Sequence, residues 1–388
     1  MSVTISRGFA AAGVAAGIRR SGKPDLALVR AIVPAVGSAM WTTNRVQAAP
    51  VVVSRRHLDL AEPQAVVVNS GVANAATGAA GEDDAEATAI RAAELMGLAP
   101  EQVVVLSTGV IGPRLPMDRV LAGVERAVAA LEPDGGASAA RAILTTDSGP
   151  KTAAVTGAGF TVGGMAKGAG MIHPWLATML VIVTTDYPLR PGEADAFLRP
   201  AVERTFNRIS VDGDCSTNDA VVLLASGASG VTRDAALDGT FAAALETVCG
   251  DLARQIVADG EGATVVLEIS VAGAATGQEA QAIARRIATS QLVKTAAFGH
   301  DPNWGRVLAA AGSAPCDGGF ARLDPGLLTV SFDGTPVFER GAPTGLVPTL
   351  GGASCRIELS LGLGDGAASY LASDLTYDYV EINAEYTT

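Results

Sequence analysis

A threonine between a glycine-rich segment and an apolar run is the most chemically suggestive feature of this sequence. Residues 163–178 read Gly-Gly-Met-Ala-Lys-Gly-Ala-Gly-Met-Ile-His-Pro-Trp-Leu-Ala-Thr, and residues 179–183 are all apolar. The apolar run predicts a buried strand, and the glycines before it predict a loop that carries Lys167. The hydroxyl of Thr178 would then lie on a rigid element beside free backbone N–H groups. This arrangement favours a nucleophile.

No motif supplies a histidine base for such a hydroxyl. The sequence has three widely separated histidines and no Gly-x-Ser-x-Gly motif, so a Ser-His-Asp hydrolase and a zinc site are unsupported, although sequence distance alone excludes neither. A threonine can instead be activated by its own α-amine once it becomes the first residue of a chain. That amine has an ordinary pKa of roughly 7.7–8.0, which suits a general base. The Ala177–Thr178 bond would first have to be cut, and an N-to-O acyl shift in a strained loop would do this.

Several segments resemble cofactor or metal motifs, but each lacks a required feature. Gly17-x4-Gly22-Lys23 matches the start of a phosphate loop, yet Pro24 stands where a Ser or Thr should bind magnesium. Residues 157–159 read Gly-Ala-Gly without the third glycine of a dinucleotide loop. The cysteines are widely spaced, with no CxxC pair: Cys215, Cys249, Cys316 and Cys355. We therefore expect free thiols, no metal and no cofactor.

The composition indicates a compact globular chain. Of its 388 residues, 48% are hydrophobic and 18% are charged, which is far from a disordered composition. The formal net charge of −12 argues against nucleic acid or an anionic membrane as a partner. No apolar run reaches the roughly 18 residues of a membrane span, and the glycine-interrupted segment at residues 9–18 is unlike a signal peptide. We expect a cytoplasmic protein.

Strand and helix patterns alternate along the chain. Because pairs of strands bounded by glycine also occur, an α/β architecture of layered, mixed sheets flanked by helices fits better than a purely parallel sheet. The predicted strands lie at 26–33, 64–69, 103–106, 179–183, 220–225 and 265–271, with a hairpin at 151–162 and short strands in the tail. The predicted helices lie at 82–97, 117–131, 139–144, 194–206, 241–258 and 279–289, and residues 298–306 are rich in turns.

These residues resemble the self-cleaving core of the ornithine acetyltransferase (glutamate N-acetyltransferase) family. Besides the segment before Thr178, motifs stand in the family's order along the whole chain. They are Arg7-Gly-Phe9, Ala11-Ala-Gly-Val-Ala-Ala-Gly17, Thr42-Thr-Asn44, Asn69-Ser-Gly71, Ser107-Thr-Gly-Val-Ile-Gly112, Thr145-Thr-Asp147, Ser216-Thr-Asn-Asp219, Asp259-Gly-Glu-Gly262 and Asp301-Pro-Asn-Trp-Gly-Arg306.

The resemblance implies a precursor that cuts itself between Ala177 and Thr178, giving an α chain of residues 1–177 and a β chain of residues 178–388 in a heterotetramer of two α and two β chains. Thr178 would take the acetyl group of N-acetylornithine, release ornithine and pass the acetyl group to glutamate, forming N-acetylglutamate for arginine biosynthesis. The resemblance leaves open whether acetyl-CoA also serves as a donor.

The resemblance also assigns site residues. Thr108 and Gly109 match the family's oxyanion hole, where a hydroxyl and a backbone N–H meet a developing negative charge. Lys167 would hold the α-carboxylate that both amino acids share, and Glu261 would face the amino end of the substrate. The implied substrate-binding residues are Thr145, Lys167, Thr178, Glu261, Asn383 and Thr388. Without the resemblance, Thr145, Glu261, Asn383 and Thr388 would be interpreted as structural.

The sequence departs from the family pattern at several positions. Trp175 and Leu176 stand where the family usually has Asn-Met, and Val72, Ala76 and Cys215 replace an expected Asn, Cys and Thr. Three alternatives to the family's activity stay open. One is a paralogue acting on a related N-acyl amino acid, another is a self-processing aminopeptidase or amidohydrolase that uses water, and the third is an uncleaved binding protein.

Overall fold

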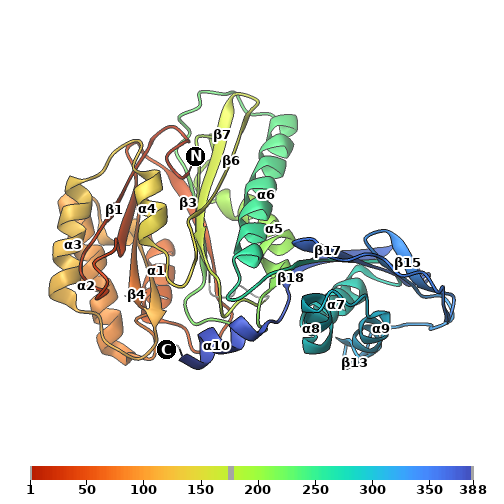
Figure 1. Ribbon diagram of the computed structural model, residues 1–388. Coiled ribbons are helices and arrows are strands. Elements are labelled where there is room, and N and C mark those ends of the chain that lie inside the picture. Colours follow the sequence, from red (N-terminus) through yellow and green to blue (C-terminus); the bar gives the residue numbers. More distant parts are fainter. Residues whose placement is uncertain (1, 174–178, 386–388) are drawn as a thin grey trace. The chain divides into compact units, whose positions relative to one another are not determined.

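The computed structural model describes residues 2–173 and 179–385, which form two compact units (Figure 1). Of the described residues, the larger unit contains 2–173, 179–207 and 214–256, and the smaller unit contains 208–213 and 257–385. The predicted boundary between an α and a β chain, Ala177–Thr178, lies outside the described residues and stays a prediction.

A four-stranded sheet forms one half of the larger unit. Its strands lie in the order β1-β2-β4-β5, and only the β4–β5 pair is parallel. Apolar side chains of α1, α2 and α3 pack on its outer face (Figure 1). The elements are β1 (Phe9–Val14), β2 (Leu26–Ala31), β4 (Ala65–Val72), β5 (Val103–Val110), α1 (Ala49–Leu58), α2 (Gly78–Met96), α3 (Met117–Ala129) and α4 (Gly136–Ala142).

A five-stranded sheet forms the other half, in the order β3-β10-β8-β7-β6. The β8–β10 pair is parallel and the other pairs are antiparallel. Figure 1 shows α6 running along this sheet on the side away from the four-stranded sheet. The elements are β3 (Val36–Trp41), β6 (Lys151–Gly157), β7 (Phe160–Lys167), β8 (Leu180–Thr185), β10 (Ala220–Ala225), α5 (Ala194–Arg204) and α6 (Ala235–Ala258).

The two sheets of the larger unit pack face to face, which explains why β8 is apolar throughout. Leu180 and Ile182 join one buried cluster with Val66, Val68 and Leu106 of the four-stranded sheet. Because neighbouring side chains of a strand point to opposite faces, Val181 and Val183 are buried on the other side. A strand buried on both faces reads as a continuous apolar run. The predicted layered α/β sandwich of mixed sheets flanked by helices is therefore confirmed.

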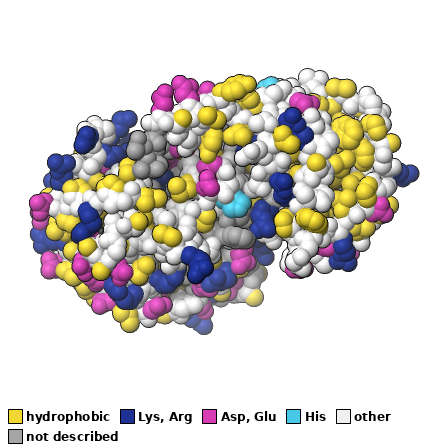
Figure 2. Space-filling model, turned by 90° about the horizontal axis from the view of Figure 1, so that it is seen from below, with side chains coloured by type: hydrophobic (Ala, Val, Ile, Leu, Met, Phe, Trp, Pro, Cys, Tyr) yellow, Lys and Arg dark blue, Asp and Glu magenta, His cyan; other side chains and the backbone are white. Residues whose placement is uncertain are grey.

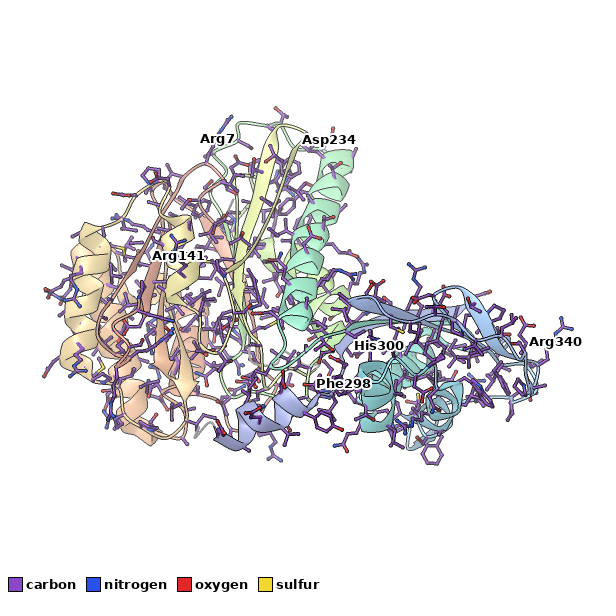
Figure 3. The ribbon with its side chains drawn as sticks, viewed as in Figure 1. Arg7, Arg141, Asp234, Phe298, His300 and Arg340 are labelled. Atoms are coloured by element: carbon purple, nitrogen blue, oxygen red, sulfur yellow. The ribbon has the colours of Figure 1, made fainter. Side chains whose placement is uncertain are left out.

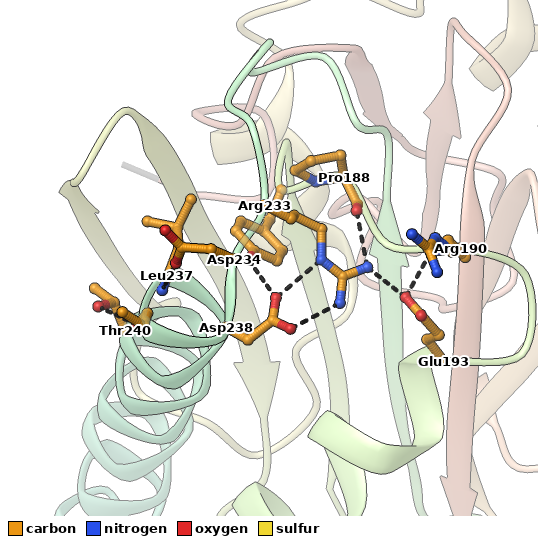
Figure 4. A network of polar contacts seen from close by, with 10 residues as sticks. Pro188, Arg190, Glu193, Arg233, Asp234, Leu237, Asp238 and Thr240 are labelled. Carbon is orange, nitrogen blue, oxygen red and sulfur yellow. Dashed lines mark hydrogen bonds and ion pairs between the residues drawn. The ribbon is translucent and has the colours of Figure 1, made fainter.

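A network of polar contacts around Arg233 lies among the segments that follow β8 and β10, and Figure 4 shows it from close by. Arg233 pairs with Asp238 through Nε at 2.9 Å and Nη2 at 3.1 Å, and it also pairs with Glu193. The Arg233 guanidinium lies over the ring of Tyr187, with its central carbon 5.6 Å from the ring centroid. Directly after β8, Asp186 is buried and accepts a hydrogen bond from the backbone N–H of Thr161 at 2.7 Å.

The smaller unit is a seven-stranded sheet whose one face is covered by helices. The strands lie in the order β16-β15-β14-β17-β11-β18-β9, and apolar side chains of α7, α8 and α9 form one core with them. The strands are β9 (Ile209–Ser210), β11 (Val266–Ala274), β14 (Thr329–Phe332), β15 (Thr335–Glu339), β16 (Ala342–Pro343), β17 (Ser354–Ser360) and β18 (Gly366–Ser373). The helices are α7 (Gly277–Ala288), α8 (Gln291–Phe298), α9 (Trp304–Gly312) and α10 (Tyr377–Glu385), and a hairpin pairs β12 (Pro315–Cys316) with β13 (Gly319–Phe320).

The surface carries charges of both signs. On the face that Figure 2 shows, acidic and basic side chains are interspersed. Figure 3 places Arg7 and Asp234 in the larger unit, and His300 and Arg340 in the smaller one. Within residues 2–173 and 179–385, none of the helices combines the length and the apolar character needed to cross a bilayer.

Three sequence predictions were wrong in detail. Residues 163–167 are not loop but the end of β7, because the glycines serve close packing: a Cβ on Gly163 would lie 2.6 Å from the carbonyl oxygen of Ser2. Residues 298–306 contain a helix start, since the side chain of Asn303 accepts a hydrogen bond from the N–H of Arg306 and caps α9. The last described element of the tail is the helix α10 and not a strand. The sequence also left β1, β3, α1 and α8 unassigned.

Candidate functional site

Thr108 and Gly109, the predicted oxyanion-hole residues (here called the oxyanion pair), lie at the end of β5. Thr108 lies opposite Ser70 and Gly109 opposite Gly71, and the β4–β5 register becomes irregular at Val72. Gly109 has φ +132°, and a Cβ placed on it would lie 2.3 Å from the carbonyl carbon of Gly71. Only glycine fits this backbone and this close approach. Thr108, the residue before Gly109, is only 4% exposed.

The loop before β10 is attached to the same strand end. The side-chain amide of Asn218 donates hydrogen bonds to the carbonyl oxygens of Ser107 at 2.8 Å and Ala73 at 2.6 Å. The hydroxyl of Ser107 in turn donates to the side-chain oxygen of Asn69 at 2.6 Å. Since Ser107 precedes Thr108, these bonds fix the position of the oxyanion pair relative to residues 216–219.

Asp219, the last residue of that loop, fixes the backbone that enters β8. Its Oδ1 accepts a hydrogen bond from the N–H of Met179 at 2.9 Å, and the carbonyl of Met179 accepts one from the N–H of Ala220 at 3.2 Å. Burial raises the pKa of Asp219 well above its ordinary value, although the Met179 amide and the charge of Lys167 act in the opposite direction. Both backbone groups of the residue that follows Thr178 are thus held in place.

Lys167 flanks β8 on the side away from β10. It is the last residue of β7, it lies opposite Leu180 in the antiparallel pair, and it is only 2% exposed. Its positive charge lowers the pKa of Asp147 and acts in the same direction on that of Asp219. A buried ammonium beside the first residues of β8 is suited to bind a carboxylate. This position was predicted, but the rigid strand that holds it was not.

Asp147 joins Thr145 to the end of β7. Its Oδ1 accepts hydrogen bonds from Lys151 Nζ at 2.7 Å and from the N–H of Gly168 at 2.6 Å. Its Oδ2 accepts from the N–H of Thr145 at 2.9 Å and from the Thr145 hydroxyl at 3.4 Å. Burial raises the pKa of Asp147, but the charges of Lys167 and Lys151 outweigh it and hold that pKa well below its ordinary value. Sequence reasoning gave Asp147 no role, although Lys151 four residues later was a signal.

Arg19 is a second residue that sequence reasoning missed. Its guanidinium donates hydrogen bonds to the hydroxyl of Ser70 and to the carbonyl of Leu144, so it ties the segment before Thr145 to the end of β4. The backbone N–H groups of Ala16 and Arg19 donate to the buried carboxylate of Asp25 at 2.6 and 2.8 Å. Of these, the N–H of Arg19 belongs to the phosphate-loop-like segment, and it is occupied by a carboxylate of the chain itself.

In the smaller unit, two of the predicted substrate-binding residues meet. The side-chain amide of Asn383, on α10, donates a hydrogen bond to Glu261 Oε2 at 3.1 Å. Next to Glu261, the carbonyl of Gly262 accepts a hydrogen bond from the hydroxyl of Thr376 at 2.7 Å. Gly262 has φ +67°, and a Cβ on it would lie 2.4 Å from the backbone nitrogen of Tyr379. The turn that carries Glu261 is thus packed tightly against the start of α10.

Comparison with known proteins identifies the family. The model of the ArgJ family matches residues 10–388. The chain belongs to the ArgJ family. It is 50% identical over 398 residues to a protein of Mycolicibacterium paratuberculosis named "Arginine biosynthesis bifunctional protein ArgJ", with 100% of this chain and 96% of the relative covered. A protein of the same name from Streptomyces coelicolor is 47% identical over 391 residues, with 100% of both chains covered.

A solved structure related to this ArgJ-family chain is that of ornithine acetyltransferase from Mycobacterium tuberculosis, complexed with ornithine. It is 48% identical, covers 45% of this chain and 94% of its own, and gives a TM-score of 0.43. The resemblance to the ornithine acetyltransferase family that the motifs indicated is confirmed.

Three predicted site residues of this ArgJ-family chain lie outside the described residues: Ala177, Thr178 and Thr388. The same holds for Trp175 and Leu176, the departures nearest the predicted cut. Their predicted roles stay predictions. Met179 is the described residue that follows Thr178, and its fixed backbone is the structural link to the predicted nucleophile.

Other reactive groups of the ArgJ-family chain are held by ordinary contacts. His57 is buried on α1, with Nδ1 3.0 Å from the carbonyl oxygen of Val103 and Nε2 3.3 Å from Glu86. None of the four cysteines, all of which the structure describes, takes part in a disulfide, and burial raises the pKa of the Cys215 thiol. In the part of the chain that the structure describes, no three His, Cys, Asp or Glu side chains are grouped to bind a metal ion.

Proposed function

We propose that this chain is a glutamate N-acetyltransferase that transfers an acetyl group from N-acetylornithine to glutamate. Membership of the ArgJ family over nearly the whole chain supports the proposal. The single observation that carries it is the gathering of site residues around the entry of β8. Thr108 and Gly109 from β5, Asp219 from the loop before β10 and Lys167 from β7 are all fixed there by strand pairing or hydrogen bonds.

The nucleophile in this proposal is Thr178, freed by cleavage of the Ala177–Thr178 bond. Its hydroxyl oxygen attacks the acetyl carbonyl carbon of N-acetylornithine, and its α-amine takes the hydroxyl proton. The oxyanion of the tetrahedral intermediate is stabilised by the hydroxyl of Thr108 and the N–H of Gly109. As the carbon–nitrogen bond breaks, the α-ammonium of Thr178 gives its proton to the leaving amine of ornithine, and an acetyl ester stays on Thr178. The amine of glutamate attacks this ester in the second half-reaction.

The remaining residues fit the binding of amino acids in this proposal. Lys167 holds the α-carboxylate that N-acetylornithine and glutamate share, because an ammonium donates charge-assisted hydrogen bonds to a carboxylate. Asp147 sets the position of Lys167 through the N–H of Gly168, and it orients Thr145 at the same time. Glu261, bound to Asn383, receives the side-chain amine of ornithine. The C-terminal Thr388 is proposed to complete the substrate site.

The proposal extends to donor, assembly and location. Because the curated relatives are named bifunctional, we propose acetyl-CoA-dependent acetylation of glutamate as a second activity. The resemblance to the family supports a heterotetramer of two α and two β chains in the cytoplasm. Intact mass and sedimentation of the purified protein test the chain composition, and incubation of acetyl-CoA with glutamate tests the second donor.

The deciding experiment follows the acetyl group. The purified protein should contain a fragment beginning at Thr178, and that fragment should gain about one acetyl group when N-acetylornithine is added without glutamate. Adding glutamate should discharge the fragment and form N-acetylglutamate. Ornithine release at the same rate with and without glutamate would show a hydrolase instead. A single band near 39 kDa that binds the substrates without turnover would show an uncleaved binding protein.

A further inference from the structure

One buried hydroxyl joins the turn of Glu261 to the helix that carries Asn383. Thr376 is only 5% exposed and stands immediately before α10. Its hydroxyl donates a hydrogen bond to the carbonyl oxygen of Gly262 at 2.7 Å and accepts one from the backbone N–H of Tyr379 at 3.1 Å. A single side chain therefore uses its donor on the turn and its acceptor on the helix.

These contacts form a closed ring that begins and ends at Glu261. The side-chain amide of Asn383 donates hydrogen bonds to Glu261 Oε2 at 3.1 Å and to the carbonyl oxygen of Tyr379 at 3.0 Å. From Tyr379 the ring passes through the hydroxyl of Thr376 to Gly262, which follows Glu261 in the chain. An amide NH2 group has two hydrogens, and the ring uses both of them. The place of the amide beside the carboxylate thus depends on the backbone that Thr376 holds.

The helix α10 depends on this cap for its position. None of its described side chains is buried, and its 9 residues are fewer than the roughly 12–15 that an isolated helix needs to be stable in water. Its first residue, Tyr377, packs edge to face on Phe298 with ring centroids 5.6 Å apart. The hydroxyl of Thr376 accepts the N–H of the third helical residue, as helix N-terminal caps do. Loss of this hydroxyl would therefore release α10, and Asn383 with it.

The turn of Glu261 has a second anchor that does not involve α10. The buried carboxylate of Asp374 accepts the N–H of Thr264 at 2.9 Å through Oδ1 and the hydroxyl of Thr264 at 2.5 Å through Oδ2. The N–H of Asp374 donates to the carbonyl oxygen of Val265 at 3.0 Å. Because Asp374 follows β18 directly, these bonds fasten the end of the turn to the seven-stranded sheet. The turn therefore keeps its place when its contact with α10 is lost.

We propose that Thr376 is the positioning residue that sets Glu261 and Asn383 as a carboxylate–amide pair for the side-chain ammonium of ornithine and N-acetylornithine. Asn383 contributes a neutral amide, so it orients the carboxylate without removing its negative charge. An ammonium donates charge-assisted hydrogen bonds to such a carboxylate, whereas an aliphatic chain of the same length gains nothing from it. The inference rests on the proposed function, because it takes Glu261 as the partner of the substrate's amine.

The test compares the binding of ornithine with that of norvaline, which has the same carbon chain and lacks the side-chain amine. Calorimetry should show that the wild-type protein binds ornithine more tightly. In Thr376→Val, which keeps the size of the side chain and removes the hydroxyl, this preference should fall by about tenfold, the usual contribution of a hydrogen bond to a charged group. The affinity for norvaline should stay unchanged. Thr376→Ser keeps the hydroxyl and should restore the wild-type preference.

Steady-state kinetics give a second measure of the same role. With N-acetylornithine as donor, Thr376→Val should raise KM and leave kcat unchanged, because the contact with the side-chain amine is the same in the ground state and in the transition state. A general loss of folded protein would lower the apparent kcat instead.

Thr276→Val is the matched control. The hydroxyl of Thr276 accepts the N–H of Glu279 at 3.2 Å and donates to Glu279 Oε2 at 3.2 Å, so it caps α7 as Thr376 caps α10. Its loss should lower the melting temperature and leave the preference for ornithine unchanged. Glu261→Gln removes the charge itself and sets the preference expected when the pair is lost completely. A fall in Thr276→Val equal to that in Thr376→Val would show a loss of stability and not of positioning.

The variants separate failure of the inference from failure of the proposed function. If Glu261→Gln loses the preference for ornithine and Thr376→Val keeps it, only the role of Thr376 is refuted. If the wild type binds ornithine no more tightly than norvaline, or Glu261→Gln keeps the preference, the role of Glu261 in the proposed function fails and the inference fails with it.

If Thr376→Val does not fold, deuterium uptake of α10 in the wild-type protein decides the outcome. Ornithine should slow the uptake, because an ammonium on the carboxylate–amide pair stabilises the ring of contacts that holds the helix, and norvaline should not. Equal uptake with the two ligands would overturn the inference.

Discussion

Replacing Asp147 with asparagine tests whether a buried ion pair holds the candidate site together. The side chain of Asp147 is 0% exposed, and that of its partner Lys151 is 3% exposed. The carboxylate accepts hydrogen bonds from Lys151, from two backbone N–H groups and from the hydroxyl of Thr145. Asparagine keeps one acceptor oxygen but turns an NH2 group towards these donors, and the Lys151 ammonium loses its carboxylate partner.

The expected loss of stability is large. Removing one partner of a buried ion pair typically costs about 3–5 kcal/mol, because the other charge stays buried. The chain offers a matched control in Asp195, which pairs with Arg199 at the same spacing of four residues but with side chains 46% and 52% exposed. Asp195→Asn should reduce the free energy of unfolding by less than about 1 kcal/mol, since water screens an exposed pair.

Urea unfolding of the wild type and both variants at pH 7 measures these differences. The pH dependence gives a second check. The pKa of Asp147 is lowered on folding, so its contribution is complete above its ordinary pKa of about 3.9 and is lost as the pH falls towards the folded value. The stability difference between wild type and Asp147→Asn should therefore shrink in acid. Equal destabilisation by Asp147→Asn and Asp195→Asn at pH 7 would refute the reasoning.

Two further predictions follow from backbone space and from a buried lysine. Gly109→Ala should abolish acetyl transfer and lower the melting temperature, because its Cβ would lie 2.3 Å from Gly71; Gly112→Ala, where φ is +102° and no atom lies within 4 Å of the Cβ, should show only the milder effect of backbone strain. Burial lowers the pKa of Lys294 to about 8 in the folded protein, whereas an ordinary lysine has a pKa of about 10.4. Between these two values the unfolded chain binds more protons than the folded one, so the free energy of unfolding rises with pH. Between pH 7.5 and 9.5 the gain should be about 2 kcal/mol. Urea unfolding should show that this gain is missing in Lys294→Met, and a variant that keeps the full gain would contradict the assignment to Lys294.

Local sequence patterns were informative where one periodicity dominated. The run at residues 220–225 predicted β10 with its observed bounds, and the helical spacing of residues 117–131 predicted α3 within two residues of its observed end. The end of β7 was missed because glycine has no side-chain pattern. Gly163 and Gly164 are typical of a flexible loop in sequence, but in the structure they allow close packing. A Cβ on Gly163 would lie 2.6 Å from the carbonyl oxygen of Ser2, and one on Gly164 would lie 2.9 Å from the side chain of Leu252.

The sequence by itself determined the layered α/β class and the family, because these are recorded in local patterns and in motifs read one after another, and the same motifs predicted the residues of the candidate site. Only the tertiary structure decided which groups meet. Asp147 and Asp219 carry no distinguishing local signal, since an aspartate in a polar loop is ordinarily solvated. They lie at the candidate site because the pairing of β8 with β7 and β10 brings distant segments to one strand end and removes the water that would otherwise screen their charges.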